Sequence, residues 1–187
     1  LEVDPRTTLI VGRNNTAKTS CFSCIGKVLD GETVSFDDYP LVRRKEFYKK
    51  IDLFMEKKLA YEDFCKKIDV ISIEFLVDYS LDDPDDNLGA LSPFIIDVDV
   101  DTTTALIRAE YRLKTDEKSL WSLLESSYYK DGAYSPSEEA HKELVDNFGK
   151  LFGLTVYAVN PNNPEDKQVK SQKELHDLFP LLSLIHI

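Results

Sequence analysis

The sequence contains no run of about eighteen apolar residues, which is the length that an α-helix needs to cross a bilayer. Its first residues, LEVDPRTT, also lack the basic and then apolar segments of a secretion signal. Basic residues are in the minority: 23 Lys and Arg stand against 34 Asp and Glu, and the formal net charge is −11. Such a chain does not bind nucleic acid over its whole surface, so any DNA contact must be local. We expect a cytoplasmic protein without membrane contacts.

Cysteine is scarce, with three residues in a chain of 187, and this odd number fits a reducing compartment. Cys21 and Cys24 have the CxxC spacing of some metal and redox sites. No second CxxC and no nearby His completes a set of four metal ligands. A metal or redox site and a pair of small buried side chains are both open interpretations, and we favour the second.

The length suits one domain, and 42% apolar residues are enough to form a core. The apolar, β-branched run 8–11 leads into Gly12, which is typical of a buried strand that ends in a tight turn. In the range 16–29 apolar residues recur at helical spacing, and Gly31 is a stop signal. The chain therefore starts with a strand, a glycine turn and a helix.

The remaining sequence alternates between two periodicities. Helical spacing predicts helices over 42–67, 115–129, 135–152 with Gly153 as the stop, and 172–179. The apolar residues of the first two are Phe47, Ile51, Phe54, Met55, Leu120, Leu123 and Leu124. Alternation predicts strands over 70–78, 94–100, 105–113 and 154–159, and polar composition predicts loops over 81–93 and 160–166.

The two alternating runs 94–100 and 105–113 flank a threonine cluster, and this spacing predicts an antiparallel hairpin. Asp97 and Asp99 would then face Arg108 and Arg112 across the hairpin. We see no internal repeat. The economical interpretation is one α/β domain with an antiparallel β region and flanking helices.

Residues 12–19 match the Walker A pattern G-x-x-x-x-G-K-[ST] except that Ala17 replaces the second glycine. In this pattern backbone N–H groups at a helix N-terminus bind phosphate oxygens, a lysine binds the β- and γ-phosphates, and a hydroxyl binds Mg²⁺. Lys18 and Thr19 fill the last two roles. A Cβ at Ala17 costs on the order of 1 kcal/mol if the position needs positive φ, which weakens nucleotide binding. An ordinary turn with Lys18 pointing to solvent is the other interpretation.

The residues predicted to bind nucleotide are Gly12, Arg13, Asn14, Asn15, Thr16, Ala17, Lys18, Thr19 and Ser20. The segment GRNNTAKTS resembles the GxNNxGKTS variant found in SMC-like ABC ATPases of the OLD (overcoming lysogenization defect) family. The paired asparagines and Ser20 carry this resemblance, and Ala17 departs from it. The later runs ISIEFLVDYS and ALIRAEYRLK also resemble the antiparallel β region of those ATPase heads.

This resemblance implies a P-loop NTPase head of the ABC/SMC-like class, with ATP and Mg²⁺ as cofactors. It also implies a head that dimerises around nucleotide and is joined to a Toprim nuclease that cuts DNA, often in phage defence. One alternative is a RecF-like or other SMC-like DNA-repair ATPase head. The other is an interaction module that no longer binds nucleotide because of Ala17. No LSGGQ-like signature, Walker B run or Toprim cluster is present in the sequence, so we expect ATP binding with little or no hydrolysis.

We interpret residues 1–181 as a partial P-loop ATPase domain that is truncated at both ends, because Leu1 is not an initiator Met and a strand follows within a dozen residues. Residues 182–187, LSLIHI, are similar to a translated sequencing-adaptor tail, and we expect them to be non-native.

Weaker signals concern charged residues. The range 43–67 holds nine basic and five acidic residues, a local net charge of about +4. It either contacts a phosphate backbone or forms a solvated helix surface with i, i+4 ion pairs. We favour the second interpretation. Asp97, Asp99 and Asp101 lack the Gly and Glu positions of a calcium loop. The acidic turn 82–86 is either a metal-binding carboxylate cluster or an exposed polar turn, and we favour the turn. His141 and His176 are predicted to be surface residues.

Overall fold

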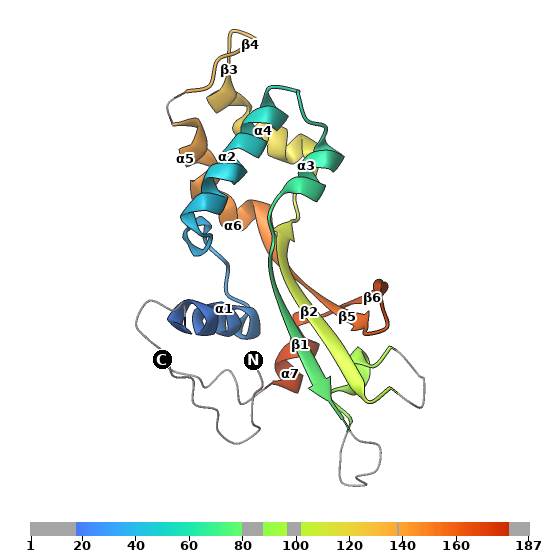
Figure 1. Ribbon diagram of the computed structural model, residues 1–187. Helices are drawn as coiled ribbons and strands as arrows, with labels where there is room; N and C mark the ends of the chain where they lie inside the picture. The colour runs from blue at the N-terminus through green and yellow to red at the C-terminus, as the bar shows by residue number, and fades with distance from the viewer. Residues whose placement is uncertain (1–17, 80–87, 97–101, 138, 180–187) are drawn as a thin grey trace.

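The fold is built around a four-stranded antiparallel sheet, whose long strands occupy the lower half of Figure 1. The computed structural model describes residues 18–79, 88–96, 102–137 and 139–179. The strand order is β1-β2-β5-β6. These strands are β1 (Ile71–Asp78), β2 (Thr104–Leu113), β5 (Phe152–Asn160) and β6 (Asn163–Lys170), and a separate ribbon consists of β3 (Tyr129–Lys130) and β4 (Ala133–Tyr134). The described part of the chain is therefore mixed α/β, with the expected antiparallel region.

The helices form two groups around this sheet. α1 (Lys18–Asp30) and α7 (Gln172–Leu178) contact each other beside the strands. The others gather beyond one end of the long strands, and we call them the helical lobe (Figure 1). They are α2 (Leu41–Met55), α3 (Tyr61–Lys67), α4 (Glu117–Tyr128), α5 (Ala140–Asp146) and α6 (Phe148–Leu151). Two short 3-10 helices, η1 (Phe36–Asp38) and η2 (Ser92–Phe94), precede α2 and β2 respectively.

Side-chain alternation gives the sheet a buried face. Every second side chain of β2 is at most 2% exposed: Ala105, Ile107, Ala109 and Tyr111. The antiparallel register places them opposite half-buried apolar residues of β1. Val28 and Leu29 of α1 belong to the same core, so α1 is held by apolar packing near its C-terminal end.

Aromatic rings join the helical lobe to the sheet. Phe148 of α6 stacks on Phe152, the first residue of β5, with ring centroids 4.2 Å apart. Phe47 of α2 lies 5.6 Å from Phe152, and Phe36 of η1 lies 5.4 Å from Phe47. All four rings are nearly fully buried. Burial of each ring contributes roughly 2 kcal/mol and each ring pair about another 1 kcal/mol, so this cluster fixes the lobe to the end of the sheet.

Several predicted elements are confirmed. α1 covers most of the range 16–29 and is followed by Gly31, whose φ of 70° is the left-handed conformation of a helix stop. α4 and α7 lie within the predicted helices 115–129 and 172–179. The strands predicted over 70–78 and 105–113 correspond to β1 and β2, and the range 154–159 lies within β5. Each of these elements has a regular apolar pattern.

The helical range 42–67 is two helices, because the backbone reverses at Lys57. Its N–H donates to the Phe54 carbonyl at 2.9 Å, and the Lys58 N–H donates to the Leu53 carbonyl at 2.9 Å. This pair of bonds is the Schellman motif, which ends a helix at a left-handed residue that is usually glycine. Lys57 takes that conformation with a φ of 62°. The sequence shows no break here because lysine replaces the expected glycine.

The predicted hairpin is wrong. β2 pairs with β1 along one edge and with β5 along the other, so no edge of β2 remains for residues 94–100. The described residues at the start of that range, 94–96, lie at the end of η2 and in coil. The apolar residues 94–96 lie at the end of a 3-10 turn and just after it, and Phe94 is 1% exposed.

The proposed contacts across that hairpin involve residues outside the described part of the chain, namely Asp97, Asp99 and Asp101. The two arginines have other partners. Arg108 Nε lies 2.8 Å from Glu74 Oε1 of β1, and Arg112 Nη1 donates to the Tyr157 hydroxyl of β5 at 2.7 Å. Both arginines therefore bridge neighbouring strands of the main sheet.

Two predictions near the C-terminal end are also wrong. The helix expected over 135–152 is divided into α5 and α6, and Gly153 lies in β5. The division falls at Asn147, whose side-chain amide donates to the Glu143 carbonyl at 2.9 Å and so competes with helical hydrogen bonding. The loop expected over 160–166 contains the start of β6, whose exposed, charged residues have no apolar alternation.

Candidate functional site

The predicted nucleotide-binding residues precede and begin α1. Gly12, Arg13, Asn14, Asn15, Thr16 and Ala17 lie outside the described residues. The described part of the chain starts at Lys18, and Lys18, Thr19 and Ser20 are the first described residues of α1. Ser20 and Cys21 are exposed. The first backbone N–H groups of a helix have no partner within the helix, and together with the helix dipole they favour an anion.

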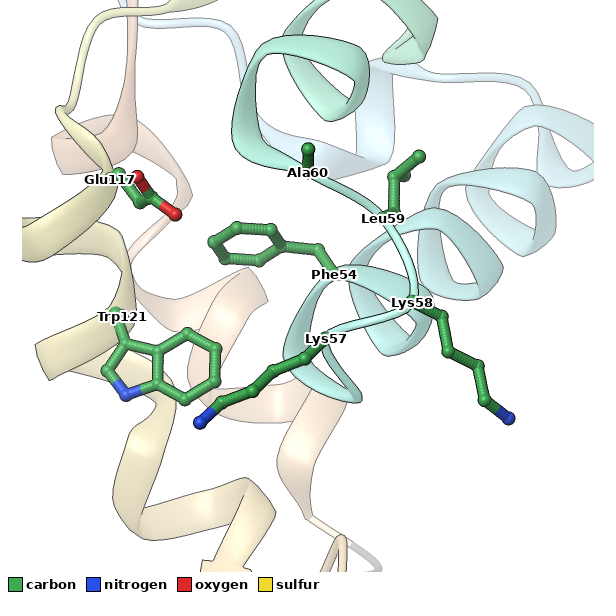
Figure 2. A pocket seen from close by; sticks show the side chains of 7 residues that line it. All are labelled: Phe54, Lys57, Lys58, Leu59, Ala60, Glu117 and Trp121. Carbon is green, nitrogen blue, oxygen red and sulfur yellow. The ribbon is translucent and has the colours of Figure 1, made fainter.

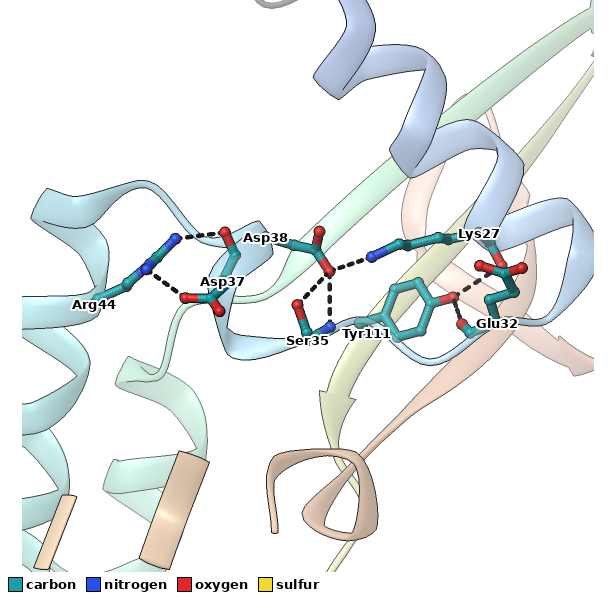
Figure 3. A network of polar contacts seen from close by, with 7 residues as sticks. All are labelled: Lys27, Glu32, Ser35, Asp37, Asp38, Arg44 and Tyr111. Atoms are coloured by element: carbon teal, nitrogen blue, oxygen red, sulfur yellow. Dashed lines mark hydrogen bonds and ion pairs between the residues drawn. The ribbon is translucent and has the colours of Figure 1, made fainter. Parts of the chain in front are cut away.

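An ion pair fixes the other end of α1 to the segment before α2 (Figure 3). Lys27 Nζ lies 2.6 Å from Asp38 Oδ2, and the same oxygen accepts the Ser35 backbone N–H at 2.7 Å and its hydroxyl at 3.1 Å. Burial of the Asp38 carboxyl opposes its ionisation, but the hydrogen bonds from Lys27 and Ser35 outweigh burial and hold the pKa of Asp38 below its ordinary value. The carboxylate is therefore charged at neutral pH.

Tyr111 of β2 links the same end of α1 to the sheet through hydrogen bonds. Its hydroxyl lies 2.5 Å from the Glu32 carbonyl oxygen and 3.1 Å from that of Lys27, and it donates its single proton to this pair (Figure 3). Burial, supported by the nearby Cys24 and acidic residues, raises the pKa of Tyr111 to about 12. The hydroxyl therefore stays protonated and remains a donor.

Polar contacts continue from this point into the helical lobe. Arg44 in the first turn of α2 lies 2.6 Å from the carboxylate of Asp37, which is the neighbour of Asp38. Its guanidinium also donates to the backbone carbonyl of Tyr39 at 2.7 Å. Figure 3 shows Arg44 and Lys27 on opposite sides of η1, where they pair with Asp37 and Asp38. One 3-10 turn therefore links the end of α1 to the start of α2.

Asp52 of α2 connects three helices of the lobe. Its Oδ1 accepts a hydrogen bond from the Tyr128 hydroxyl of α4 at 2.8 Å and lies 2.8 Å from His141 Nε2 of α5. The His141 ring also stacks on Tyr48. Burial, and then the hydrogen bond to Asp52, raise the pKa of Tyr128 far above its ordinary value. The side chains of His141 and Asp52 are 41% and 37% exposed, so solvent reaches this cluster.

The arrangement around Asp52 carries no signal in the sequence, because 76 and 89 positions separate it from Tyr128 and His141. His141 is partly exposed, but it has partners that a solvated surface histidine lacks. His176 is exposed, as predicted. Three-helix contacts of this kind become visible only when the helices are packed.

A pocket of about 420 Å³ lies where α2, α3 and α4 meet (Figure 2). Its apolar lining comes from Phe54, Leu59, Ala60 and Trp121, and its charged lining from Lys57, Lys58 and Glu117. Lys57 Nζ lies 5.1 Å from the centroid of the Trp121 ring and 5.8 Å from that of Tyr129. Lys58 Nζ lies 2.5 Å from Glu56, and Figure 2 shows it extending away from the indole. The pocket therefore combines an aromatic surface with a cation.

Many basic residues of the range 43–67 are paired with acidic residues. The pairs include Arg43–Glu46 at 2.9 Å, Arg44–Asp37 at 2.6 Å, Lys50–Asp69 at 3.4 Å and Lys58–Glu56 at 2.5 Å. None of these four pairs has the expected i, i+4 spacing, and Arg44 and Lys50 pair with acidic residues outside the range. Lys57 at the pocket differs from these residues, because its contacts are with aromatic rings.

The prediction of small buried cysteines is wrong for the CxxC pair, because Cys21 is exposed and Cys24 is partly exposed. Both thiols and that of Cys65 are free. The described ranges contain no group of three or more His, Cys, Asp or Glu side chains placed to hold a metal ion.

None of the helices in the described ranges combines the length and the apolar character that crossing a bilayer requires. Function must be argued from the residues and geometry given above. Compared with protein-family models, with curated proteins and with solved structures, the chain matches none of them.

Proposed function

We propose that this chain is the nucleotide-binding front portion of a P-loop ATPase of the ABC/SMC-like class. Backbone N–H groups of residues 12–17 and of the first turn of α1 bind the phosphates, Lys18 neutralises them and Thr19 ligates Mg²⁺. The observation that carries the proposal is the Walker A-like segment GRNNTAKTS together with a helix that the structure describes from its lysine onward.

The way α1 is held supports this role. Lys27 and Tyr111 fix the last turn of α1. Near its other end, Ser20 and Cys21 are exposed to solvent. A helix that binds phosphate through its N-terminal amides has to keep that end accessible and has to be positioned from elsewhere. The contacts at the last turn of α1 and the exposure of Ser20 and Cys21 support this role.

We further propose that the full-length protein is a cytoplasmic OLD-like ATPase that dimerises around nucleotide and regulates a DNA endonuclease. The paired asparagines Asn14 and Asn15 and the trailing Ser20 support this narrower assignment. A RecF-like or other SMC-like repair ATPase is the alternative. A Toprim motif in the full-length reading frame would support the assignment as a nuclease-linked ATPase. A heptad repeat would support the assignment as a repair ATPase.

Calorimetric titration of ATP with Mg²⁺ tests nucleotide binding in three proteins, which are the native chain, Lys18→Ala and Ala17→Gly. We expect Lys18→Ala to weaken binding at least about tenfold, because it removes a cation from the phosphates. Ala17→Gly should strengthen binding by about five- to tenfold, which corresponds to roughly 1 kcal/mol of relieved strain. Circular dichroism should show the same helix content in all three.

Equal affinity of the native chain and Lys18→Ala would overturn the proposal. Binding by Ala17→Gly alone would show that the site is retired in the native chain and would favour the interaction module. Thr19→Ala is the matched test of the metal role, because it should remove the Mg²⁺ dependence of binding while Lys18 remains.

A further inference from the structure

We infer that the pocket beside Trp121 binds one unit of a single-stranded nucleic acid, with a base stacked on the indole and a phosphate at Lys57. The pocket lies in the helical lobe, whereas the proposed ATP site lies at the start of α1. The inference goes beyond the proposed function and does not depend on it.

The backbone of Lys57 is the first observation. Its φ of 62° is uncommon for a residue other than glycine, and the Schellman hydrogen bonds around it would form equally well with glycine. Strained backbone conformations cluster at functional sites, so a strained residue at an exposed position points to a role for its side chain. Glycine would remove the strain but also the only part of Lys57 that reaches the pocket.

The environment of the Lys57 ammonium is the second observation. It lies over the rings of Trp121 and Tyr129. Within the described ranges, no carboxylate lies within 4 Å of it, in contrast to Lys58 and Lys50. The aromatic rings therefore orient the cation without neutralising it, and its charge is available to an anion.

The indole is the third observation. Trp121 is partly exposed, and Phe54 packs edge-on against it with centroids 5.8 Å apart and an interplanar angle of 79°. Figure 2 shows Phe54 and the indole on one side of the pocket and Lys57 reaching toward the indole. A fixed aromatic surface next to an unneutralised cation is the combination that binds single strands without sequence preference.

Local charge favours a polyanion over a neutral ligand. The pocket adjoins the range 43–67, where basic residues exceed acidic ones, although the whole chain has a net charge of −11. Because Arg43, Arg44, Lys50 and Lys58 are ion-paired, Lys57 supplies the positive charge at the pocket. Glu117 also lines the pocket and repels phosphate, so the phosphate belongs on the side of Lys57. A volume of about 420 Å³ lies within the range of small-ligand pockets and accommodates one base at a time.

Trp121 is the single tryptophan of the chain, so its fluorescence reports on this pocket alone. The test titrates the 187-residue chain carrying Lys18→Ala, which removes the proposed ATP site, with an oligothymidylate of about twelve nucleotides. We expect saturable quenching that weakens with added salt, because phosphate binding releases counterions. Failure of ATP binding in the native chain leaves this experiment unaffected.

Two variants decide the role of Lys57. Lys57→Gly keeps the Schellman turn and should weaken oligonucleotide binding at least about fivefold. Lys173→Ala in α7 removes the same charge at an exposed position away from the pocket and should leave binding unchanged. Absence of saturable quenching, or equal affinity of Lys57→Gly and the parent chain, would overturn the inference.

Thymidine monophosphate distinguishes a polymer from a free nucleotide. Weak quenching by the monophosphate at equal nucleotide concentration supports a single-stranded polymer, since neighbouring phosphates add to binding. Equal quenching by both ligands would show that the pocket takes free nucleotides and would overturn the assignment to nucleic acid.

Discussion

The imidazole ring of His141 lies parallel to the phenol ring of Tyr48, with centroids 4.1 Å apart and an interplanar angle of 9°. The same imidazole lies 2.8 Å from the carboxylate of Asp52, which also accepts a hydrogen bond from Tyr128. Three helices of the lobe therefore meet at one carboxylate. This contact links α2, α4 and α5 to one another.

Asp52→Ala should destabilise the protein by about 1–3 kcal/mol, because it leaves the buried Tyr128 hydroxyl without its acceptor. His141→Ala should cost less, about 0.5–1 kcal/mol, because its contact with Asp52 is partly exposed. Urea denaturation followed by circular dichroism measures both. A loss for His141→Ala that equals the loss for Asp52→Ala would show that the imidazole, and not Tyr128, is the main partner of the carboxylate.

Lys57→Gly should be more stable than Lys57→Ala by about 1 kcal/mol, since only glycine takes the left-handed conformation without steric cost. Both variants lose the contact with Trp121, so their difference isolates the backbone contribution. Thermal unfolding should separate their midpoints by about 2–4 °C. Equal midpoints would mean that the turn at residue 57 relaxes when its side chain is shortened.

Asp38 should contribute to stability at neutral pH and lose this contribution in acid. Its pKa in the folded state is below the value of about 3.9 that an unfolded Asp has. A lowered pKa means that the contribution is complete above the unfolded value and disappears as the pH falls through the folded value. The difference in urea midpoint between the native chain and Asp38→Asn should therefore shrink from about pH 6 to below pH 3. A difference that grows in acid would contradict this assignment.

Tyr111→Phe should destabilise the protein by about 1 kcal/mol, because the carbonyls of Glu32 and Lys27 lose a donor. Tyr39→Phe is the matched control, since the Tyr39 hydroxyl makes only a long contact of 3.4 Å with the Asp69 carbonyl. Amide hydrogen exchange in α1 should rise in Tyr111→Phe more than in the control. Equal exchange in both variants would show that α1 is held by its apolar packing alone.

Regular apolar spacing explains which elements were predictable. α1, α4 and β1 each bury one face, and burial of one face imposes a period on the sequence. β6 was not predictable, because it joins the sheet through backbone hydrogen bonds and keeps nearly all of its side chains exposed. The break between α2 and α3 was hidden for a related reason, because Lys57 occupies a position where the chemistry of the turn calls for glycine.

The two candidate sites also differ in how far the sequence predicts them. The Walker A-like segment is local, so its spacing can be read directly, although the structure describes only its last residues. The pocket combines side chains from the end of α2, the turn after it and the start of α4. Trp121 and Lys57 are 64 positions apart in the numbering, and their proximity depends on how α2 packs against α4. No pattern within either helix indicates that contact.

The contact between α1 and α7 has a consequence for biosynthesis. Gly31, at the end of α1, approaches the side chain of Gln172 so closely that a Cβ would lie 2.0 Å from it. The first and last described helices therefore pack against each other, although more than 140 residues of chain separate them. While the ribosome is still making the middle of the protein, the apolar side of α1 lacks this cover. Final docking of α1 must then wait until α7 has left the exit tunnel.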